Sequence, residues 1–282
     1  MKSNFLRISL VALLALLISC SRDEVHVEDP VNNAIRNSEM ELSNRYAGRK
    51  SSSECNFEYE GGEGPENWAN LCGEAWMDCS GNSQSPINIV TNKVVEDDYI
   101  NNININYSTS KVDIYNNGHT VQFNYTSGSS ADLNNIEYDL LQFHFHTESE
   151  HTINGYRYPM EAHLVHRDPN TGLLAVVGVF FEEGDANKIL KKYFNNFPEF
   201  EGTHYTDRSR FHIEDLLPED LDFYTYPGSL TTPGCSEIVT WYVLKEPITA
   251  SVSQIRKLKD IMHKNYRPVQ ELNGRVIRSQ DD

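Results

Sequence analysis

The chain has 282 residues and a formal net charge of −17, with 39% hydrophobic and 11% aromatic residues. This length suits one large domain or two small ones, and the apolar content supports a substantial core, which argues against a wholly disordered chain. The acidic balance argues against nucleic acid as a partner, because a basic face is needed to displace the counterions of a phosphate backbone.

Residues 1–20 are predicted to be a lipoprotein-type signal peptide. Lys2 and Arg7 precede an apolar run over 8–18, which is too short to span a bilayer, for which about 20 residues are needed, but suits a secretory signal. The run ends in "LLISC", which resembles a bacterial lipobox, so Cys20 would be lipidated and become the first residue of the mature chain. The alternative is an ordinary signal peptide with a chance cysteine. We expect an exported protein, attached to a bacterial membrane, the outer one, only through this lipid, and facing the periplasm or the cell surface.

Residues 21–55 are polar and charged with little periodicity, which indicates a flexible spacer, with a short helix over 33–46 as an alternative. Residues 56–282 are predicted to form one sheet-dominated α/β domain. Apolar and polar residues alternate in seven predicted strands, at 100–108, 111–117, 119–125, 139–149, 158–168, 173–183 and 236–246. Helical spacing occurs at 186–197 and 253–265, where Ser251 or Ser253 could cap the second helix.

Apart from Cys20, the chain has four cysteines, Cys55, Cys72, Cys79 and Cys235. An even number in an exported chain predicts disulfides, and four cysteines allow three pairings. The residues alone leave the pairing open, and they also leave open an intermolecular bond through Cys55 or Cys72.

Five of the ten histidines lie between residues 144 and 166. His144 and His146 are two apart in a predicted strand, so both side chains point to one face. His163 lies in the next predicted strand, and a hairpin across "TINGYRY" would bring three imidazoles together. Three histidines with one open position are typical of a catalytic zinc site, although they do not exclude cobalt or iron.

Two further side chains share these strand faces. A metal-bound histidine donates its other N–H to an acceptor, and Gln142 and Glu161 can supply one each. This pattern favours a metal site over the alternative of ordinary strand histidines. The spacing of His151 predicts a buried, hydrogen-bonded residue that faces away, and His166 is predicted to be peripheral. His26, His204, His212 and His263 form no constellation.

These residues carry a resemblance to a known family. "QFHFHTESEH…EAHLVH", together with "GNSQSPINI", "NNGH", "YPGSLTTPGCSE" and "VTWYVLKEPI", resembles the α-class carbonic anhydrases of bacterial type. The resemblance covers about four-fifths of the chain, from Phe57 to the C-terminus, with the motifs in family order. It implies one α/β domain on a large central, mostly antiparallel, twisted β-sheet with a few peripheral helices.

The resemblance also implies a role for each matching residue. His144, His146 and His163 would bind Zn²⁺, with acceptors at Gln142, Glu161 and the main-chain carbonyl of Asn265. The catalytic residues would be Thr231 with its partner Glu150, and His119 as the proton shuttle. The substrate pocket would comprise Val165, Val176, Leu230, Thr232, Val239 and Trp241, and the residues that order water would be Tyr59, Asn117 and Gln122.

The implied reaction is the reversible hydration of carbon dioxide to bicarbonate and a proton by a zinc-bound hydroxide. The ionised Glu150 accepts only, so Thr231 donates to it and must accept from the hydroxide. Carbon dioxide is uncharged, so an apolar wall suits it, and a histidine with a pKa near 6.5 at the rim can export the proton at neutral pH.

Further properties follow from the same resemblance. They are a side esterase activity, inhibition by sulfonamides and anions, and a Cys79–Cys235 disulfide, which leaves Cys55 with Cys72. A homodimer is left open. The alternative from another class is a catalytically silent binding module on the same fold, against which the three retained histidines argue. Two departures from the family pattern are Gly234, where a second proline is common, and Thr147, where many animal members have Trp.

Overall fold

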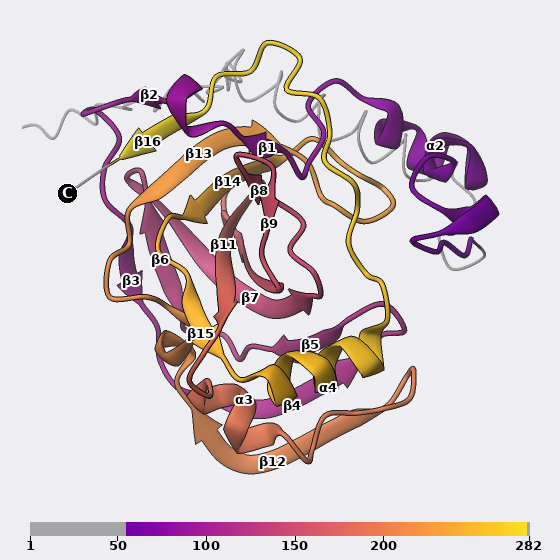
Figure 1. Cartoon of the computed structure of the whole chain (residues 1–282). Helices are drawn as coiled ribbons and strands as arrows, with labels where there is room; N and C mark the ends of the chain where they lie inside the picture. Colours follow the sequence, from indigo (N-terminus) through magenta and orange to yellow (C-terminus); the bar gives the residue numbers. More distant parts are fainter. Residues whose placement is uncertain (1–54, 281–282) are drawn as a thin grey trace, which may run out of the picture. The chain divides into compact units, whose positions relative to one another are not determined.

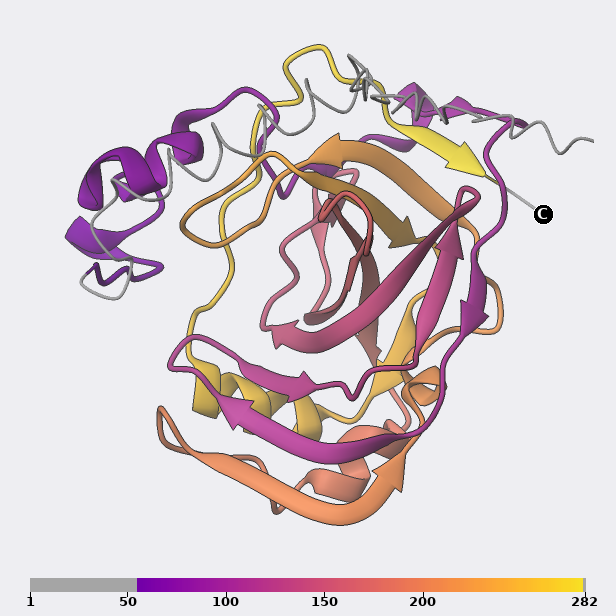
Figure 2. The same cartoon turned by 180° about the vertical axis from the view of Figure 1, so that it is seen from behind.

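The computed structural model describes residues 55–280, and a large twisted β-sheet organises this part of the chain (Figures 1 and 2). The sheet follows the order β12-β4-β5-β7-β10-β11-β14-β13-β16-β2, with β15 paired to β11, β6 paired to β7 and β3 paired to β6. Its strands are β2 (Val95–Glu96), β3 (Asn104–Asn106), β4 (Ser110–Asn116), β5 (Val121–Asn124), β6 (Ser130–Leu133), β7 (Ile136–His146), β10 (Met160–Arg167), β11 (Leu174–Glu183), β12 (His204–Phe211), β13 (Phe223–Gly228), β14 (Val239–Leu244), β15 (Ile248–Ala250) and β16 (Arg278–Gln280).

Smaller elements surround this sheet. A second, small sheet contains β1 (Asn88–Ile89), β8 (Thr152–Ile153) and β9 (Tyr156–Arg157). The α-helices are α2 (Trp68–Leu71), α3 (Lys188–Tyr193) and α4 (Val252–Met262). The 3₁₀ helices are η2 (Gly61–Glu63), η3 (Gly73–Ser80), η4 (Thr91–Lys93) and η5 (Ile213–Leu216). None of the helices in the described residues is both long enough and apolar enough to cross a membrane.

Most strand pairings of the large sheet are antiparallel, which confirms the predicted fold class. The exceptions make the sheet mixed, because β11 runs parallel to β14 and β15, and β16 runs parallel to β2. The predicted hairpin is confirmed, since β7 and β10 pair antiparallel with Glu161 opposite His146 and His163 opposite His144.

The sheet separates two apolar clusters. The larger one lies against the helices and includes Phe143 and Leu164 from the sheet with Leu190 of α3 and Leu258 of α4. The smaller one uses the alternate residues of the same strands, such as Val165 of β10. Because successive side chains of a strand point to opposite faces, the histidines of β7 and β10 fall on the side of the smaller cluster.

All seven predicted strands exist, with shifted ends. The strand predicted at 100–108 shrinks to β3, and the one predicted at 139–149 begins earlier and ends at His146. The helix predicted at 186–197 is confined to α3, with Asn187 as its N-cap, and α4 begins with the predicted Ser251 cap in a capping box. The sequence did not reveal β12, which is largely exposed, or β13, which ends in a proline and a glycine that favour a turn.

Several predictions lie outside the described residues. These are the signal peptide over 1–20 with Cys20, the spacer up to residue 54 with its helix over 33–46, and His26. They stay predictions.

Candidate metal centre

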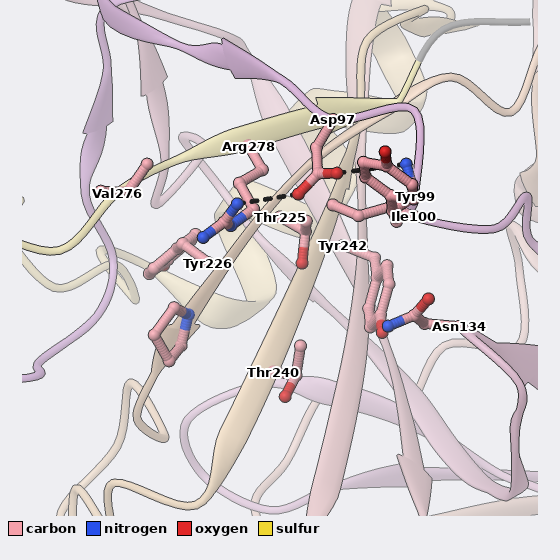
Figure 3. A pocket seen from close by; sticks show the side chains of 11 residues that line it. Asp97, Tyr99, Ile100, Asn134, Thr225, Tyr226, Thr240, Tyr242, Val276 and Arg278 are labelled. Carbon is pink, nitrogen blue, oxygen red and sulfur yellow. Dashed lines mark hydrogen bonds and ion pairs between the residues drawn. The ribbon is translucent and has the colours of Figure 1, made fainter.

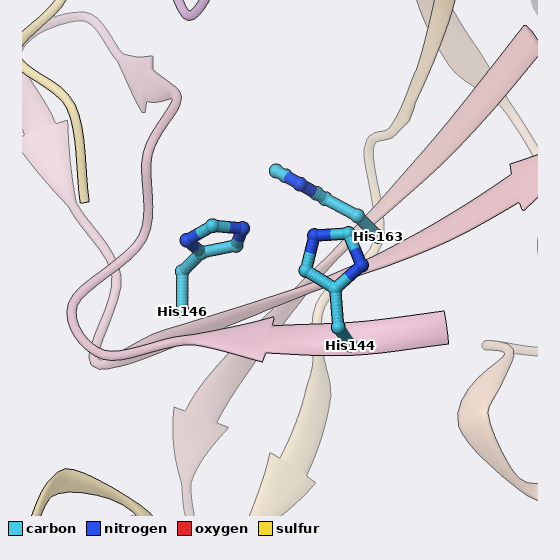
Figure 4. Close-up of side chains that lie close together, drawn as sticks. All are labelled: His144, His146 and His163. Carbon is cyan, nitrogen blue, oxygen red and sulfur yellow. The ribbon is translucent and has the colours of Figure 1, made fainter. Parts of the chain in front are cut away.

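Strand pairing brings His144, His146 and His163 together on one face of the sheet (Figure 4). The imidazole centroids lie 5.1 Å apart for His144–His146, 5.4 Å for His144–His163 and 4.5 Å for His146–His163. One ring nitrogen from each residue lies within 4.8 Å of the others. Direct opposition across the β7–β10 pair and a two-residue step along β7 therefore suffice to build a three-imidazole cluster.

The second nitrogen of each imidazole has a fixed partner. His144 Nδ1 lies 2.9 Å from Gln142 Oε1, and His146 Nδ1 lies 2.6 Å from the carbonyl oxygen of Asn265. His163 Nε2 lies 2.9 Å from Glu161 Oε1. All three partners are acceptors, so these three ring nitrogens carry the protons and donate. The lone pairs then reside on Nε2 of His144, Nε2 of His146 and Nδ1 of His163.

The surroundings favour neutral imidazoles. Burial, followed by the neighbouring histidines, holds the pKa of His144 well below its usual value, and burial likewise lowers the pKa of His146. His146 Nε2 is buried and has no hydrogen-bond partner among the described residues. A buried lone pair without a donor is costly unless something binds it, so the donor set fits a metal ion that prefers three neutral imidazoles, as zinc does.

The carboxylate of Glu161 is the hub behind the cluster. Besides His163, its Oε1 accepts from His151 Nδ1 at 2.8 Å, and its Oε2 accepts from the backbone N–H groups of Glu150 and His151 at 2.8 and 2.9 Å. Burial raises the pKa of Glu161, but its interactions with His151 and His163, which include a hydrogen bond from each ring, outweigh burial and hold it well below its usual value. A fully buried carboxylate is thus kept ionised by the groups that it orients.

His151 is buried and hydrogen-bonded, as predicted, but the expectation that it faces away is wrong. Strand β7 ends at His146, so the regular alternation does not continue to His151, and its ring reaches Glu161. Its other nitrogen lies 2.7 Å from the hydroxyl of Tyr226. His151, Glu161 and His163 also have ligand atoms close enough for a metal, but Glu161 is already committed to four donors. The sequence pattern gave no signal for the contacts of His151 with Glu161 and Tyr226.

The prediction that His166 is peripheral is also wrong. His166 is fully buried, and its Nε2 lies 2.7 Å from the hydroxyl of Tyr107. The pairing of β7 and β10 shifts register between Val165 and His166, and β10 is buried on both faces, so a residue out of phase with the ligands enters the main core. Burial lowers the pKa of His166 to about 4.

Glu150 lies beside the ligand nitrogens and is completely buried. Its Oε1 accepts from the backbone N–H of Arg267 at 2.7 Å, while its Oε2 lies 3.5 Å from His146 Nε2 and has no hydrogen-bond partner in the described part of the chain. Thr231 is 5% exposed. One carboxylate oxygen is therefore free to accept from a hydroxyl, and the pairing of Thr231 with Glu150 stays a prediction.

The loop that carries Thr231 is tied to the N-terminal segment. It connects β13 to β14, and the predicted Cys79–Cys235 disulfide crosses from it to η3. Gln84 Nε2 donates to the carbonyl oxygen of Cys235 at 3.1 Å. The second predicted disulfide, Cys55–Cys72, is also present and lies within the chain. Both pairings are confirmed.

Arg267, which the sequence did not single out, reinforces this connection. Its buried guanidinium donates to Gln84 Oε1 at 2.8 Å and to the carbonyl oxygens of Ser85 and Cys79 at 2.9 and 3.1 Å. Because its backbone N–H holds Glu150, one residue links the N-terminal segment to the site.

An apolar wall lines the same face of the sheet. The predicted pocket residues of this wall are Val165, Val176, Leu230, Val239 and Trp241, and all of them belong to or pack against the smaller apolar cluster. The Trp241 ring lies 4.8 Å from the imidazole of His163, and its Nε1 donates to the carbonyl oxygen of Ser229 at 3.1 Å. Thr232 is partly exposed in the adjoining loop. The structure thus brings the predicted wall next to the histidine cluster.

The predicted rim residues lie at strand ends and in a turn. His119 is partly buried, its ring stacks on Phe57 at 3.9 Å, and burial lowers its pKa. Asn117 Oδ1 accepts from the backbone N–H groups of His119 and Thr120 at 3.0 and 2.8 Å, so it shapes the turn. Tyr59 is buried, which raises its pKa, and its ring lies 6.3 Å from that of His119.

Of two hollows of about 420 Å³ each, one adjoins a predicted site residue and the other does not. One is lined by His119 and Phe57 at the rim. The other lies beside β13, β14 and β16, where Arg278 Nη1 donates to Asp97 Oδ2 at 2.7 Å and Tyr99 stands at the edge (Figure 3). None of the predicted site residues lines the second hollow, so we assign it no part in the chemistry.

Three converging lone pairs beside an apolar wall are an arrangement that could hold a metal ion, and comparison with known proteins narrows the class of protein. The family model described as "Eukaryotic-type carbonic anhydrase" matches residues 63–281. A carbonic anhydrase of Pectobacterium atrosepticum is 39% identical over 220 residues, which are 78% of this chain and 88% of that protein.

Solved structures agree. The α-carbonic anhydrase of Thermovibrio ammonificans in complex with the inhibitor sulfanilamide superposes with a TM-score of 0.77 and 40% identity, covering 79% of this chain and 99% of the other. Dioscorin complexed with ascorbate superposes with a TM-score of 0.75 and 32% identity, covering 80% and 98%. The chain belongs to the eukaryotic-type, or α, carbonic anhydrase family, a family of lyases.

Proposed function

We propose that this chain catalyses the reversible hydration of carbon dioxide to bicarbonate and a proton with Zn²⁺ held by His144, His146 and His163. The observation that carries the proposal is the set of three converging lone pairs, each fixed by an acceptor on the opposite ring nitrogen. A zinc ion in such a site is a Lewis acid that lowers the pKa of a coordinated water, an effect for which carbonic anhydrases are themselves the standard example.

The residues of the chain supply the rest of the reaction. Trp241 and the valines of the apolar wall exclude water from the place where uncharged carbon dioxide would bind. Thr231, donating to the free oxygen of Glu150, would have only its lone pairs left to offer the reacting oxygen, which fixes the direction of that oxygen.

His119 would then carry the proton from the site to the buffer. Its ring lies at the rim, and burial lowers its pKa, so a neutral imidazole is available to accept a proton near neutral pH. A side esterase activity requires no other group, because the same wall and the same reacting oxygen would serve. Sulfonamides and anions would inhibit by binding at the open position of the three-histidine site.

Metal content tests the ligand assignment. Protein dialysed against zinc and then against buffer should retain one zinc per chain, whereas His144→Ala should retain much less. The matched control is His212→Ala, an exposed histidine outside the site, which should retain wild-type zinc. Equal zinc in His144→Ala and wild type would disprove the assignment. The dioscorin structure shows that a protein of this fold can be found with another small molecule, and a zinc-free chain would favour such a binding module.

We also propose that the protein is exported and anchored to the outer membrane through a lipid on Cys20, facing the periplasm or the cell surface. The lipobox-like "LLISC" supports this proposal, as do the two disulfides, because disulfides persist in oxidising compartments. Cells fed labelled palmitate should label the wild type and not Cys20→Ala. An unlabelled wild type would indicate plain secretion.

A further inference from the structure

A chain of polar side chains crosses from the edge strand β12 to the face that carries the histidine cluster. His204 Nδ1 donates to Asp113 Oδ1 at 2.8 Å, and the His204 ring stacks on Tyr115 at 4.3 Å. Asp113 Oδ2 accepts from Asn124 Nδ2 at 2.8 Å. Asn124 Oδ1 accepts in turn from Gln122 Nε2 at 2.6 Å. The sequence predicted no partner for His204. The pairing of β12 with β4 brings it next to Asp113.

The direction of every hydrogen bond in this chain follows from one member. Burial raises the pKa of Asp113, but hydrogen bonds from His204 and Asn124 and the charge of His204 outweigh it, so the pKa is lowered. An ionised carboxylate only accepts. Asn124 must therefore turn its NH₂ to Asp113 and its oxygen to Gln122. Gln122 must then donate with its NH₂, which leaves its oxygen, Oε1, pointing the other way.

Gln122 lies on the face of the sheet that carries His144. Gln122 pairs directly with His144 across β5 and β7, and Asn124 pairs with Gln142. Directly opposed residues on antiparallel strands have Cβ atoms about 5 Å apart on the same face. In the side-chain hydrogen bonds of the described residues, Gln122 takes part as a donor to Asn124, and its Oε1 accepts from none of them. The Gln122 side chain beside His144 therefore donates its NH₂ group to Asn124, and its oxygen is available to accept a hydrogen bond from water.

We propose that Asp113 is a positioning residue that sets the polarity of the Gln122 amide, so that the wall beside His144 presents a hydrogen-bond acceptor and not a donor. The proposal rests on the proposed function and on the role that the family resemblance implies for Gln122, which is to order the waters between the site and His119. A water that donates to Gln122 Oε1 keeps its lone pairs directed into the water chain. If the Gln122 amide were reversed, its NH₂ group would donate to that water, and the water would turn its O–H groups into the water chain. Proton export would then slow, whereas the conversion of carbon dioxide to bicarbonate would keep its rate.

Asp113→Asn tests this polarity with almost no change in shape. An asparagine can offer Asn124 either its oxygen or its NH₂, so the direction of the chain is no longer dictated. We expect kcat in saturating buffer to fall about fivefold, which corresponds to about 1 kcal/mol, with kcat/KM unchanged. Asp113→Glu, which restores an ionised acceptor, should recover most of the loss.

A second readout does not need activity. In the metal-free protein, the NMR signals of the Gln122 side-chain NH₂, assigned by their loss in Gln122→Glu, should show one proton shifted downfield by its hydrogen bond to Asn124. This shift should disappear in Asp113→Asn. The matched control is His204→Phe, which keeps a ring against Tyr115 and leaves Asp113 ionised at neutral pH. It should preserve both the shift and kcat.

The results of these experiments distinguish the role of Asp113 from the proposed catalytic function. Wild-type NMR shifts in Asp113→Asn would overturn the polarity of the chain, and equal losses in Asp113→Asn and His204→Phe would show a merely structural role. A fall in kcat/KM equal to that in kcat would also contradict a role in proton export. If the wild type were inactive, the proposed function would fail, whereas the NMR comparison would still decide whether Asp113 orients Gln122.

Discussion

Glu161→Gln would break the hub of the site with almost no change in shape. In the wild type, one carboxylate oxygen accepts from the backbone N–H groups of Glu150 and His151, and the other accepts from the rings of His151 and His163. A glutamine has one oxygen and one NH₂ group, so only one of these two pairs can keep its acceptor.

Either orientation of the glutamine has a cost that follows from the geometry. If its NH₂ faces the rings, His163 must accept at Nε2, so the ring proton moves to Nδ1, the nitrogen required for metal binding. Loss of such an acceptor alone weakens metal binding about 10- to 100-fold, and a proton on the ligand nitrogen should bring the loss to at least the upper value. If its NH₂ faces the backbone, two buried N–H groups lose their acceptor at about 1–3 kcal/mol each.

Two assays separate these orientations. Competition with a chromophoric chelator measures zinc affinity, and urea unfolding of the metal-free protein measures stability. We expect Glu161→Gln either to bind zinc at least about 100-fold more weakly or to lose about 2–6 kcal/mol of unfolding free energy. Glu182→Gln, on the exposed end of β11, is the matched control and should change neither. Wild-type zinc affinity together with wild-type stability in Glu161→Gln would refute the hub.

Four further predictions concern the disulfides and the proposed catalytic residues. Cys235→Ser opens a loop of 156 residues and should lower the unfolding free energy by about 5 kcal/mol, against about 3 kcal/mol for Cys72→Ser, which opens one of 17 residues; equal losses in urea unfolding would contradict the loop-entropy origin. His119→Ala should lower kcat in weak buffer at least about tenfold, with partial rescue by imidazole. Because burial lowers the pKa of His119, kcat of the wild type should rise with pH through an inflection below about 6.5, and an inflection above that value would count against His119. Thr231→Ala should lower kcat/KM by about 100-fold and Thr231→Ser much less, as steady-state hydration assays would show; a wild-type rate in Thr231→Ala would remove it from the reaction.

The ligand cluster could be predicted because period-two spacing survives folding wherever strands are regular. His144, His146 and His163 lie in the stretch of the β7–β10 pair, from Glu161 to Val165 on β10, where alternation and direct pairing are regular. The prediction failed for His151 because β7 has already ended, and for His166 because the other face of β10 is covered by the larger apolar cluster. A local pattern contains no information about where a strand stops.

The sequence pattern could not predict contacts between segments that lie far apart in the chain. The partner of Glu150 on the backbone of Arg267 is 117 positions away, and the bond between Asp113 and His204 depends on β12. That strand is mostly exposed and has no hydrophobic alternation, so nothing in its composition predicts that it joins the sheet. Only the resemblance to a family supplied the Asn265 carbonyl as a partner for His146.

Stopped-flow measurement of carbon dioxide hydration, on wild-type and His144→Ala protein exposed to equal zinc, tests the central claim most directly. A zinc site built by His144, His146 and His163 predicts rapid hydration by the wild type, abolished by a sulfonamide, and hydration close to the uncatalysed rate for His144→Ala. Equal hydration by the two proteins, or a zinc-loaded wild type no faster than buffer, would contradict it.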